Sequence, residues 1–221
     1  MLLGHYGVAF GAKRALPRTS LGTLVLAAQL LDELWPIFLV LGIERARPAP
    51  GLMAANSLEF VYYPFSHSLA AAIVWSLLLG GVYYGLRHDR RSATIIGVLV
   101  LSHWILDLPM HAPDLQLWPG SSVHVGLGAW RSLPLTIVLE LAVFVPGLVM
   151  YLRATRARDR IGSWALWAMV ILLVVIFFSG FSSAPPPESA IGYEALGLWV
   201  FVPWGYWIDR HRVPASTPVA A

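Results

Sequence analysis

The run Ser163-Trp-Ala-Leu-Trp-Ala-Met-Val-Ile-Leu-Leu-Val-Val-Ile-Phe-Phe-Ser-Gly-Phe181 decides the class of fold, because it contains no charged residue. An α-helix of about 20 apolar residues crosses the hydrocarbon core of a bilayer. Five further stretches are long and apolar enough to do the same, namely 19–43, 66–86, 92–109, 132–152 and 190–208. The sequence therefore predicts an all-α, polytopic transmembrane helical bundle with six full spans, forming one integral membrane domain over residues 1–221.

The composition of the 221-residue chain agrees with this prediction. Hydrophobic residues make up 57% of the chain and charged residues only 12%, whereas a soluble domain carries about a quarter charged residues. An ordinary cytosolic enzyme and a disordered chain are therefore excluded. The absence of cysteine excludes disulfides and thiolate metal sites, and a net charge of only +3 gives no reason to expect nucleic-acid binding.

The first residues form an apolar segment too short to span a bilayer. Lys13 and Arg14 follow this segment, whereas a signal peptide carries its positive charges before the apolar part. Residues 2–15 are therefore predicted as a short, Gly-rich re-entrant helix that packs against the first full span as a hairpin. A helix lying in the membrane interface is the alternative.

Positive charge predicts the orientation, because cytoplasmic loops carry an excess of Lys and Arg. Twelve of the 15 Lys and Arg residues fall in four segments predicted to share one side, namely 13–18, 87–91, 153–160 and 210–212. That side is predicted to be cytoplasmic and includes the C-terminus. The loops 44–65 and 110–131 would then face the exterior.

Two ionisable residues of the third span share one helix face. His103 and Asp107 have i, i+4 spacing in Ser102-His-Trp-Ile-Leu-Asp107, which places both side chains on the same side of a helix. An imidazole nitrogen and a carboxylate oxygen at this spacing can bind Zn or another borderline divalent ion. A buried His–Asp hydrogen bond that only ties helices together is the alternative.

Other ionisable residues lie within or beside predicted spans. Asp32 lies in the middle of the first span, His67 at the start of the second and Glu140 in the fourth. His5 lies between small residues near the N-terminus, and His111 follows the third span. Ionisable groups inside a membrane are costly and are functional candidates by default.

The depths of these groups predict that they meet. With about 1.5 Å of rise per helical residue, five of them come out about 16–22 Å above the cytoplasmic ends of their segments. His67 comes out higher, near about 30 Å, unless the preceding loop folds inward. A polar cavity in the outer half of the membrane is therefore predicted to hold a divalent metal, with Zn as the first candidate. Its predicted ligands are His5, Asp32, His67, His103, Asp107 and His111.

Four short motifs resemble a known family. They are Gly4-His-Tyr-Gly-Val8, Gln29-Leu-Leu-Asp32, Tyr63-Pro-Phe-Ser-His-Ser68 and Ser102-His-Trp-Ile-Leu-Asp-Leu-Pro-Met-His-Ala-Pro-Asp114. In this order they resemble the bacterial membrane-bound metal-dependent hydrolase-like proteins of the YdjM-like group, over about residues 1–160. The resemblance implies a metal-dependent hydrolase of the bacterial inner membrane, without an established substrate.

A fainter similarity concerns the zinc-dependent phospholipase C and P1 nuclease group. The similarity would make Asp32, His67, His103 and Asp107 metal ligands, with His111 on a neighbouring ion. This chain has neither the N-terminal Trp ligand nor the later HxxxE of that group, since His124 is followed by Val-Gly-Leu-Gly. One or two ions are therefore expected rather than three.

These observations predict a metal-dependent membrane hydrolase, with Asp107 or Glu140 as the general base. A site opening among lipids would suit a lipid or phosphoester substrate reached from the outer leaflet. Two alternatives stay open. Acids and histidines at mid-membrane depth are also typical of a proton- or cation-coupled transporter, and the polar cluster would equally suit a non-catalytic accessory subunit that binds other membrane proteins.

Overall fold

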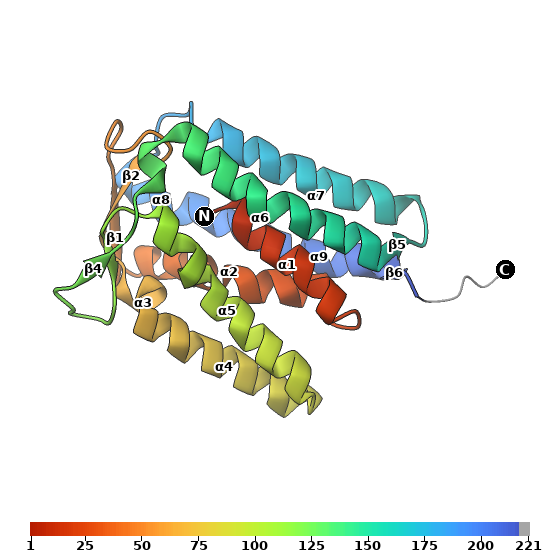
Figure 1. Ribbon diagram of the computed structural model, residues 1–221. Helices are drawn as coiled ribbons and strands as arrows, with labels where there is room; N and C mark the ends of the chain where they lie inside the picture. The colour runs from red at the N-terminus through yellow and green to blue at the C-terminus, as the bar shows by residue number, and fades with distance from the viewer. Residues whose placement is uncertain (217–221) are drawn as a thin grey trace.

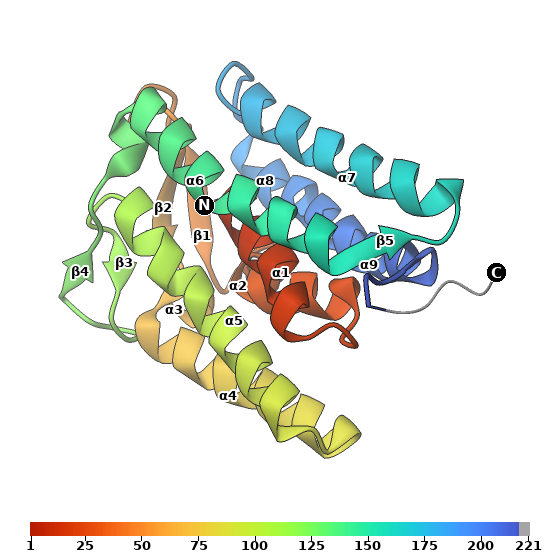
Figure 2. The ribbon, with the colours of Figure 1, turned by 45° about the vertical axis from the view of Figure 1, so that its right-hand side comes forward.

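The computed structural model, which describes residues 1–216, contains five helices long and apolar enough to cross a membrane. They are α2 (Leu21–Val40), α4 (Leu69–Arg87), α5 (Arg90–Met110), α6 (Leu133–Ala154) and α7 (Arg160–Ser179). They form a helical bundle (Figures 1 and 2), which confirms the predicted all-α class and five of the six predicted spans.

Each of these five helices begins at a residue that can cap it. The first turn of a helix leaves backbone N–H groups without partners, and Ser or Asp side chains accept hydrogen bonds from them. In every case the cap side chain accepts from a backbone N–H two or three residues ahead; the caps are Ser20, Ser68, Asp89, Ser132 and Asp159. The ends of the spans are therefore set by local sequence.

The stretch 190–208, predicted as a sixth span, is not one helix. It falls into α8 (Glu188–Ala195), a 3-10 helix, η2 (Leu196–Val200), and α9 (Phe201–Arg210). The tighter 3-10 turns include Gly197, and glycine is a weak helix former. The three pieces follow one another without an intervening loop, and the backbone at Leu196 and Phe201 is right-handed helical. The stretch is therefore a helical run with a 3-10 section in place of the single α-helix predicted.

The predicted short N-terminal helix is present as α1 (Leu3–Ala15) and lies in the middle of the bundle (Figure 2). It contacts α2, as predicted, but its more extensive packing is on α6. The two helices approach closely where the backbones of Gly7 and Gly147 meet. Small residues at this crossing let the backbones touch, and they explain why α6 rather than α2 is the main neighbour.

Short antiparallel ribbons close the two ends of the bundle (Figure 1). One end holds two ribbons, β1 (Arg45–Pro48) with β2 (Leu58–Tyr62) and β3 (Leu115–Gln116) with β4 (His124–Val125). The same end carries the short helix α3 (Pro64–His67) and a 3-10 turn, η1 (Ala129–Arg131). The other end holds β5 (Thr155–Ala157) paired with β6 (Arg212–Pro214).

The four segments rich in Lys and Arg all lie at the β5–β6 end (Figure 1). There the ammonium group of Lys13 lies 3.0 Å from Asp209 and ties α1 to α9. The shared end agrees with the predicted distribution of charge, while the side of the membrane on which it lies stays a prediction. Residues 217–221, and with them the end of the C-terminal tail, lie outside the described residues.

Candidate metal centre

Helix α5 supplies the two central groups of the site. His103 and Asp107 are almost fully buried, with 0% and 1% exposure, and His103 Nε2 lies 3.2 Å from Asp107 Oδ2. The other ring nitrogen, Nδ1, lies 2.8 Å from the backbone carbonyl oxygen of Ala28. A carbonyl oxygen only accepts hydrogen bonds, so Nδ1 carries a proton.

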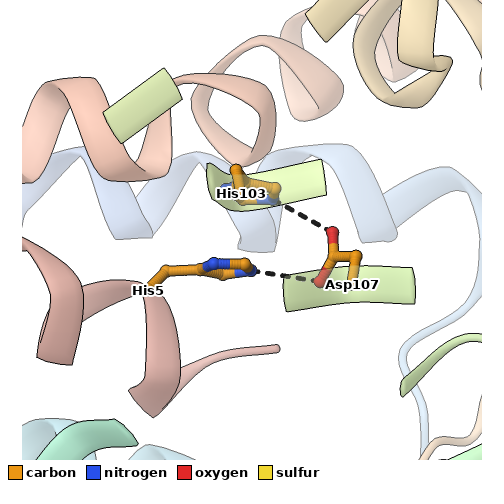
Figure 3. Close-up of side chains that lie close together, drawn as sticks. All are labelled: His5, His103 and Asp107. Carbon is orange, nitrogen blue, oxygen red and sulfur yellow. Dashed lines mark hydrogen bonds and ion pairs between the residues drawn. The ribbon is translucent and has the colours of Figure 1, made fainter. Parts of the chain in front are cut away.

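The neutral form of the His103 ring therefore presents a lone pair at Nε2. Among the described residues this atom makes no hydrogen bond of good geometry, but it lies 3.2 Å from Asp107 Oδ2 (Figure 3) and 3.6 Å from Asp32 Oδ1. A lone pair opposed by two carboxylate oxygens in a buried site is unfavourable unless a proton or a cation lies between them. The arrangement thus has the chemistry of a cation site.

Two more elements bring donors to the same point. Asp32 comes from the middle of α2 and His67 from the last residue of α3, and His67 Nε2 lies 3.2 Å from Asp32 Oδ1. His67 Nε2 also lies 3.8 Å from Asp107 Oδ2. The segment before α4 does fold inward, because Ser68 is extended and separates His67 from that helix.

The spacing of the donors suits a small divalent ion. Ligand atoms at about 2.0–2.1 Å from a tetrahedral ion are about 3.3–3.4 Å apart. Four donor pairs among Asp32, His67, His103 and Asp107 are separated by 3.2, 3.2, 3.6 and 3.8 Å. Two imidazole nitrogens with carboxylate oxygens are typical ligands of Zn.

Helix α1 places His5 against this group (Figure 3). Its ring stacks on that of His103, with centroids 3.6 Å apart, and its Nε2 lies 3.1 Å from Asp107 Oδ1. The amino group of Met1 also forms an ion pair with Asp107. His5, His103 and Asp107 therefore make a second set of three donors, in addition to Asp32, His67 and His103.

Glu140 lies next to the cluster but is bound to the backbone of α1. Its two carboxylate oxygens accept hydrogen bonds from the N–H groups of Leu2 at 2.8 Å and Gly4 at 2.7 Å. These are first-turn donors of α1 that otherwise lack partners. Glu140 thus fixes α1 to α6, while its predicted role as a general base stays a prediction.

His111 lies at the edge of the cluster, with Nε2 3.9 Å from Asp107 Oδ2. Its Nδ1 is 3.0 Å from Asp114, which also accepts a hydrogen bond from the Tyr63 hydroxyl at 2.8 Å. Burial and the neighbouring Asp114 carboxylate hold the pKa of Tyr63 well above its usual value, so this hydroxyl keeps its proton. His111 belongs to neither three-donor set among the described residues, and its predicted role as a ligand stays a prediction.

Glu44 is a buried residue of the site to which the sequence analysis assigned no role. It follows α2 and is 1% exposed, yet in the sequence it resembles a charge at the end of a span. Its carboxylate binds the start of α3, two residues from His67. No spacing rule links Glu44 to Ser66, 22 residues later, so only the fold reveals the contact.

A cavity of about 470 Å³ opens beside the cluster. Asp32, His67 and Asp107 line it, and the Asp32 side chain is 24% exposed, so the donors can be reached from the cavity. Its remaining wall is largely apolar and includes Trp35, Phe60, Trp130, Phe177 and Leu198. Thr136 and Glu140 of α6 and Ile176 and Phe177 of α7 line it, so the cavity reaches from one of these helices to the other.

Taken together, the bundle and its buried cluster define a multi-pass helical membrane protein with a candidate metal centre. The family model of the YdjM inner membrane protein matches residues 2–184, and the chain therefore belongs to that family. No curated protein and no solved structure matches the chain. The family match confirms the resemblance to the YdjM group and an inner-membrane location, while hydrolase activity and the similarity to zinc-dependent phospholipases stay predictions.

Proposed function

We propose that this protein is a metal-dependent hydrolase of the inner membrane that uses one divalent ion, with Zn as the first candidate. The observation that carries the proposal is the state of His103. Its Nδ1 is committed to the Ala28 carbonyl, and its Nε2 lies between two carboxylates, 3.2 Å from Asp107 Oδ2 and 3.6 Å from Asp32 Oδ1. A cation at this point would neutralise both carboxylates and give Nε2 a partner.

In this proposal Asp32, His67 and His103 would hold the ion, and the ion would supply an activated water. A bound divalent ion lowers the pKa of its water and polarises the ester oxygen of a substrate. Asp107 Oδ2 faces the same point and would accept the proton of a water that attacks the phosphorus. The P–O bond to the alcohol would then break, and the proton held by Asp107 would pass to the leaving oxygen. His5 contacts the other oxygen of Asp107, Oδ1, and so keeps Oδ2 turned toward the centre.

The number of ions follows from His103. Both three-donor sets include this residue, and only its Nε2 is free to bind, because Nδ1 is hydrogen-bonded to Ala28. One nitrogen lone pair binds one ion. A single ion is therefore proposed, within the range of one or two that the motifs predict.

The cavity supports a lipid or lipid-like ester as the substrate. Its wall is mostly apolar, and it also carries carboxylates and histidines of the cluster. An amphiphile matches this polarity, with its phosphoester at the cluster and its apolar chain between α6 and α7. His67 ends α3, which lies at the end of the bundle opposite the one rich in Lys and Arg, and this supports access from the outer leaflet.

Metal content and turnover test the proposal in the purified full-length protein. We expect about one zinc per wild-type chain and hydrolysis of a phospholipid in detergent micelles, with both lost in His103→Ala. His124 offers a matched control, since it is an exposed histidine on β4, and His124→Ala should keep metal and activity. Equal zinc content in wild type and His103→Ala would contradict the proposal. Proton-coupled uptake into liposomes by a metal-free protein would instead favour the transporter alternative.

A further inference from the structure

We propose that Glu44 and Ser66 are positioning residues that hold His67 in the tautomer able to bind a metal ion. This inference rests on the proposed function, because it assigns His67 as a ligand. Neither residue touches the centre itself. Both are buried, with 1% and 0% exposure, and both act through hydrogen bonds on the side of the His67 ring that faces away from Asp32.

Glu44 is held firmly by the first turn of α3. One carboxylate oxygen, Oε1, accepts the backbone N–H groups of Phe65 and Ser66, each at 2.8 Å. The other oxygen, Oε2, lies 2.6 Å from the Ser66 hydroxyl. Three donors converge on one buried carboxylate and fix its position. Burial raises the pKa of Glu44 above its ordinary value, and the hydrogen bonds from Ser66 and Phe65 oppose that rise.

Counting protons then determines the state of His67. A carboxylate can only accept, so the single hydroxyl proton of Ser66 is donated to Glu44. Ser66 Oγ also lies 2.7 Å from His67 Nδ1. With its own proton committed, Ser66 Oγ can only accept there, and His67 Nδ1 must therefore carry a proton.

The consequence is a lone pair at the correct atom. With a proton on Nδ1, the neutral His67 ring presents the lone pair of Nε2, which lies 3.2 Å from Asp32 Oδ1. At His103 the Ala28 carbonyl accepts the hydrogen bond of Nδ1, so that Nε2 again presents the lone pair. Two histidines from different helices thus present Nε2 to one point, each set by a hydrogen bond from Nδ1 to an acceptor.

The substitution Glu44→Gln isolates this effect, because it preserves shape and retains an oxygen for the two backbone N–H groups. The glutamine amide would donate to Ser66 Oγ, so that the Ser66 proton is released toward His67 Nδ1. A hydrogen bond donated by Ser66 to His67 Nδ1 favours the His67 tautomer with its proton on Nε2, and this proton blocks the atom at which the metal would bind. We expect zinc affinity to fall by about 10–100-fold, the range found when a group that orients a metal ligand is removed.

Zinc affinity and the His67 tautomer provide two independent measurements. Affinity is measured by chelator competition on the full-length protein, and the tautomer by nitrogen NMR of the metal-free protein with labelled histidine. Glu59→Gln is the matched control, because Glu59 lies in the same end region but pairs with the exposed Arg47. Ser66→Ala tests the same relay if Glu44→Gln fails to fold.

We expect weaker zinc binding in Glu44→Gln and Ser66→Ala, a changed His67 tautomer in Glu44→Gln, and wild-type values in Glu59→Gln. The inference would be overturned if Glu44→Gln kept both the zinc affinity and the His67 tautomer of the wild type. Absence of zinc binding in the wild type would refute the proposed function instead, and the NMR measurement would still show whether Glu44 sets the tautomer.

Discussion

Replacing Gly7 by alanine would test whether the crossing of α1 and α6 holds the metal centre together. A Cβ atom at Gly7 would lie 2.6 Å from the Cα of Phe144 and 2.7 Å from the carbonyl oxygen of Val143, whereas ordinary contact begins at 3.4 Å. Both obstacles are backbone atoms, so no side-chain rotation relieves them. Helix α1 must therefore move away from α6 by about 0.8 Å.

A displacement of this size would break the attachment of α1. The hydrogen bonds from Leu2 and Gly4 to Glu140, now 2.8 and 2.7 Å long, would lengthen to about 3.5 Å, beyond the normal range. Overpacking alone costs about 1–3 kcal/mol, and each kcal/mol lowers the melting temperature of a chain of this size by about 2–4 °C. His5 would move with the helix, so zinc binding should weaken as well.

Thermal denaturation in detergent, with and without zinc, measures both effects. Gly81→Ala is the matched control, because a Cβ at Gly81 on α4 meets nothing within 4 Å; it should leave the melting temperature unchanged or raise it slightly. A Gly7→Ala protein that melts and binds zinc like the wild type would refute the reasoning, since it would mean that α1 and α6 do not pack as described.

Three further outcomes are expected. In thermal denaturation, zinc at about a hundred times its dissociation constant should stabilise the wild type by about 2.7 kcal/mol, and EDTA should abolish this gain. The stability of Asp32→Ala should change neither with zinc nor with EDTA. Lys13→Met should cost about 3–5 kcal/mol, because it leaves the carboxylate of Asp209 without its ammonium partner in a mostly buried site; an unchanged melting temperature would show that the pair contributes nothing. The hydrogen bond from His211 lowers the pKa of Asp159 below its ordinary value of 3.8, so the pair stabilises the fold above that pH and its contribution is lost as the pH falls through the lower folded pKa. The difference in melting temperature between the wild type and Asp159→Asn, which keeps a helix cap, should therefore shrink as the pH falls below 3.8 and through the lower folded pKa.

Much of this architecture could be predicted from the sequence, because a bilayer imposes a length on each span and the rise of a helix is constant. That is why counting residues placed Asp32, His103 and Asp107 at one depth, and why they meet in the structure. The same count did not foresee that the stretch 190–208 contains a 3-10 section between two α-helices.

Other features depend on contacts that no period or spacing records. Counting along one continuous span put His67 too high, because it ends a separate short helix. The packing of α1 on α6 depends on Gly7 and Gly147, which lie far apart in the sequence. Glu44 was overlooked because a carboxylate after a span is usually solvated, and its burial against α3 depends on the tertiary fold.

The candidate donors all lie between residues 5 and 111, whereas the far wall of the cavity comes from α7 and the segments after it. One wall of the cavity is therefore encoded apart from the donors, although Trp35 and Phe60 of the first half also line the cavity. Changes in α7 and the segments after it could alter which molecule is admitted while leaving the donors untouched. Exchanging only these segments between two family members would then be a direct way to change selectivity without rebuilding the centre.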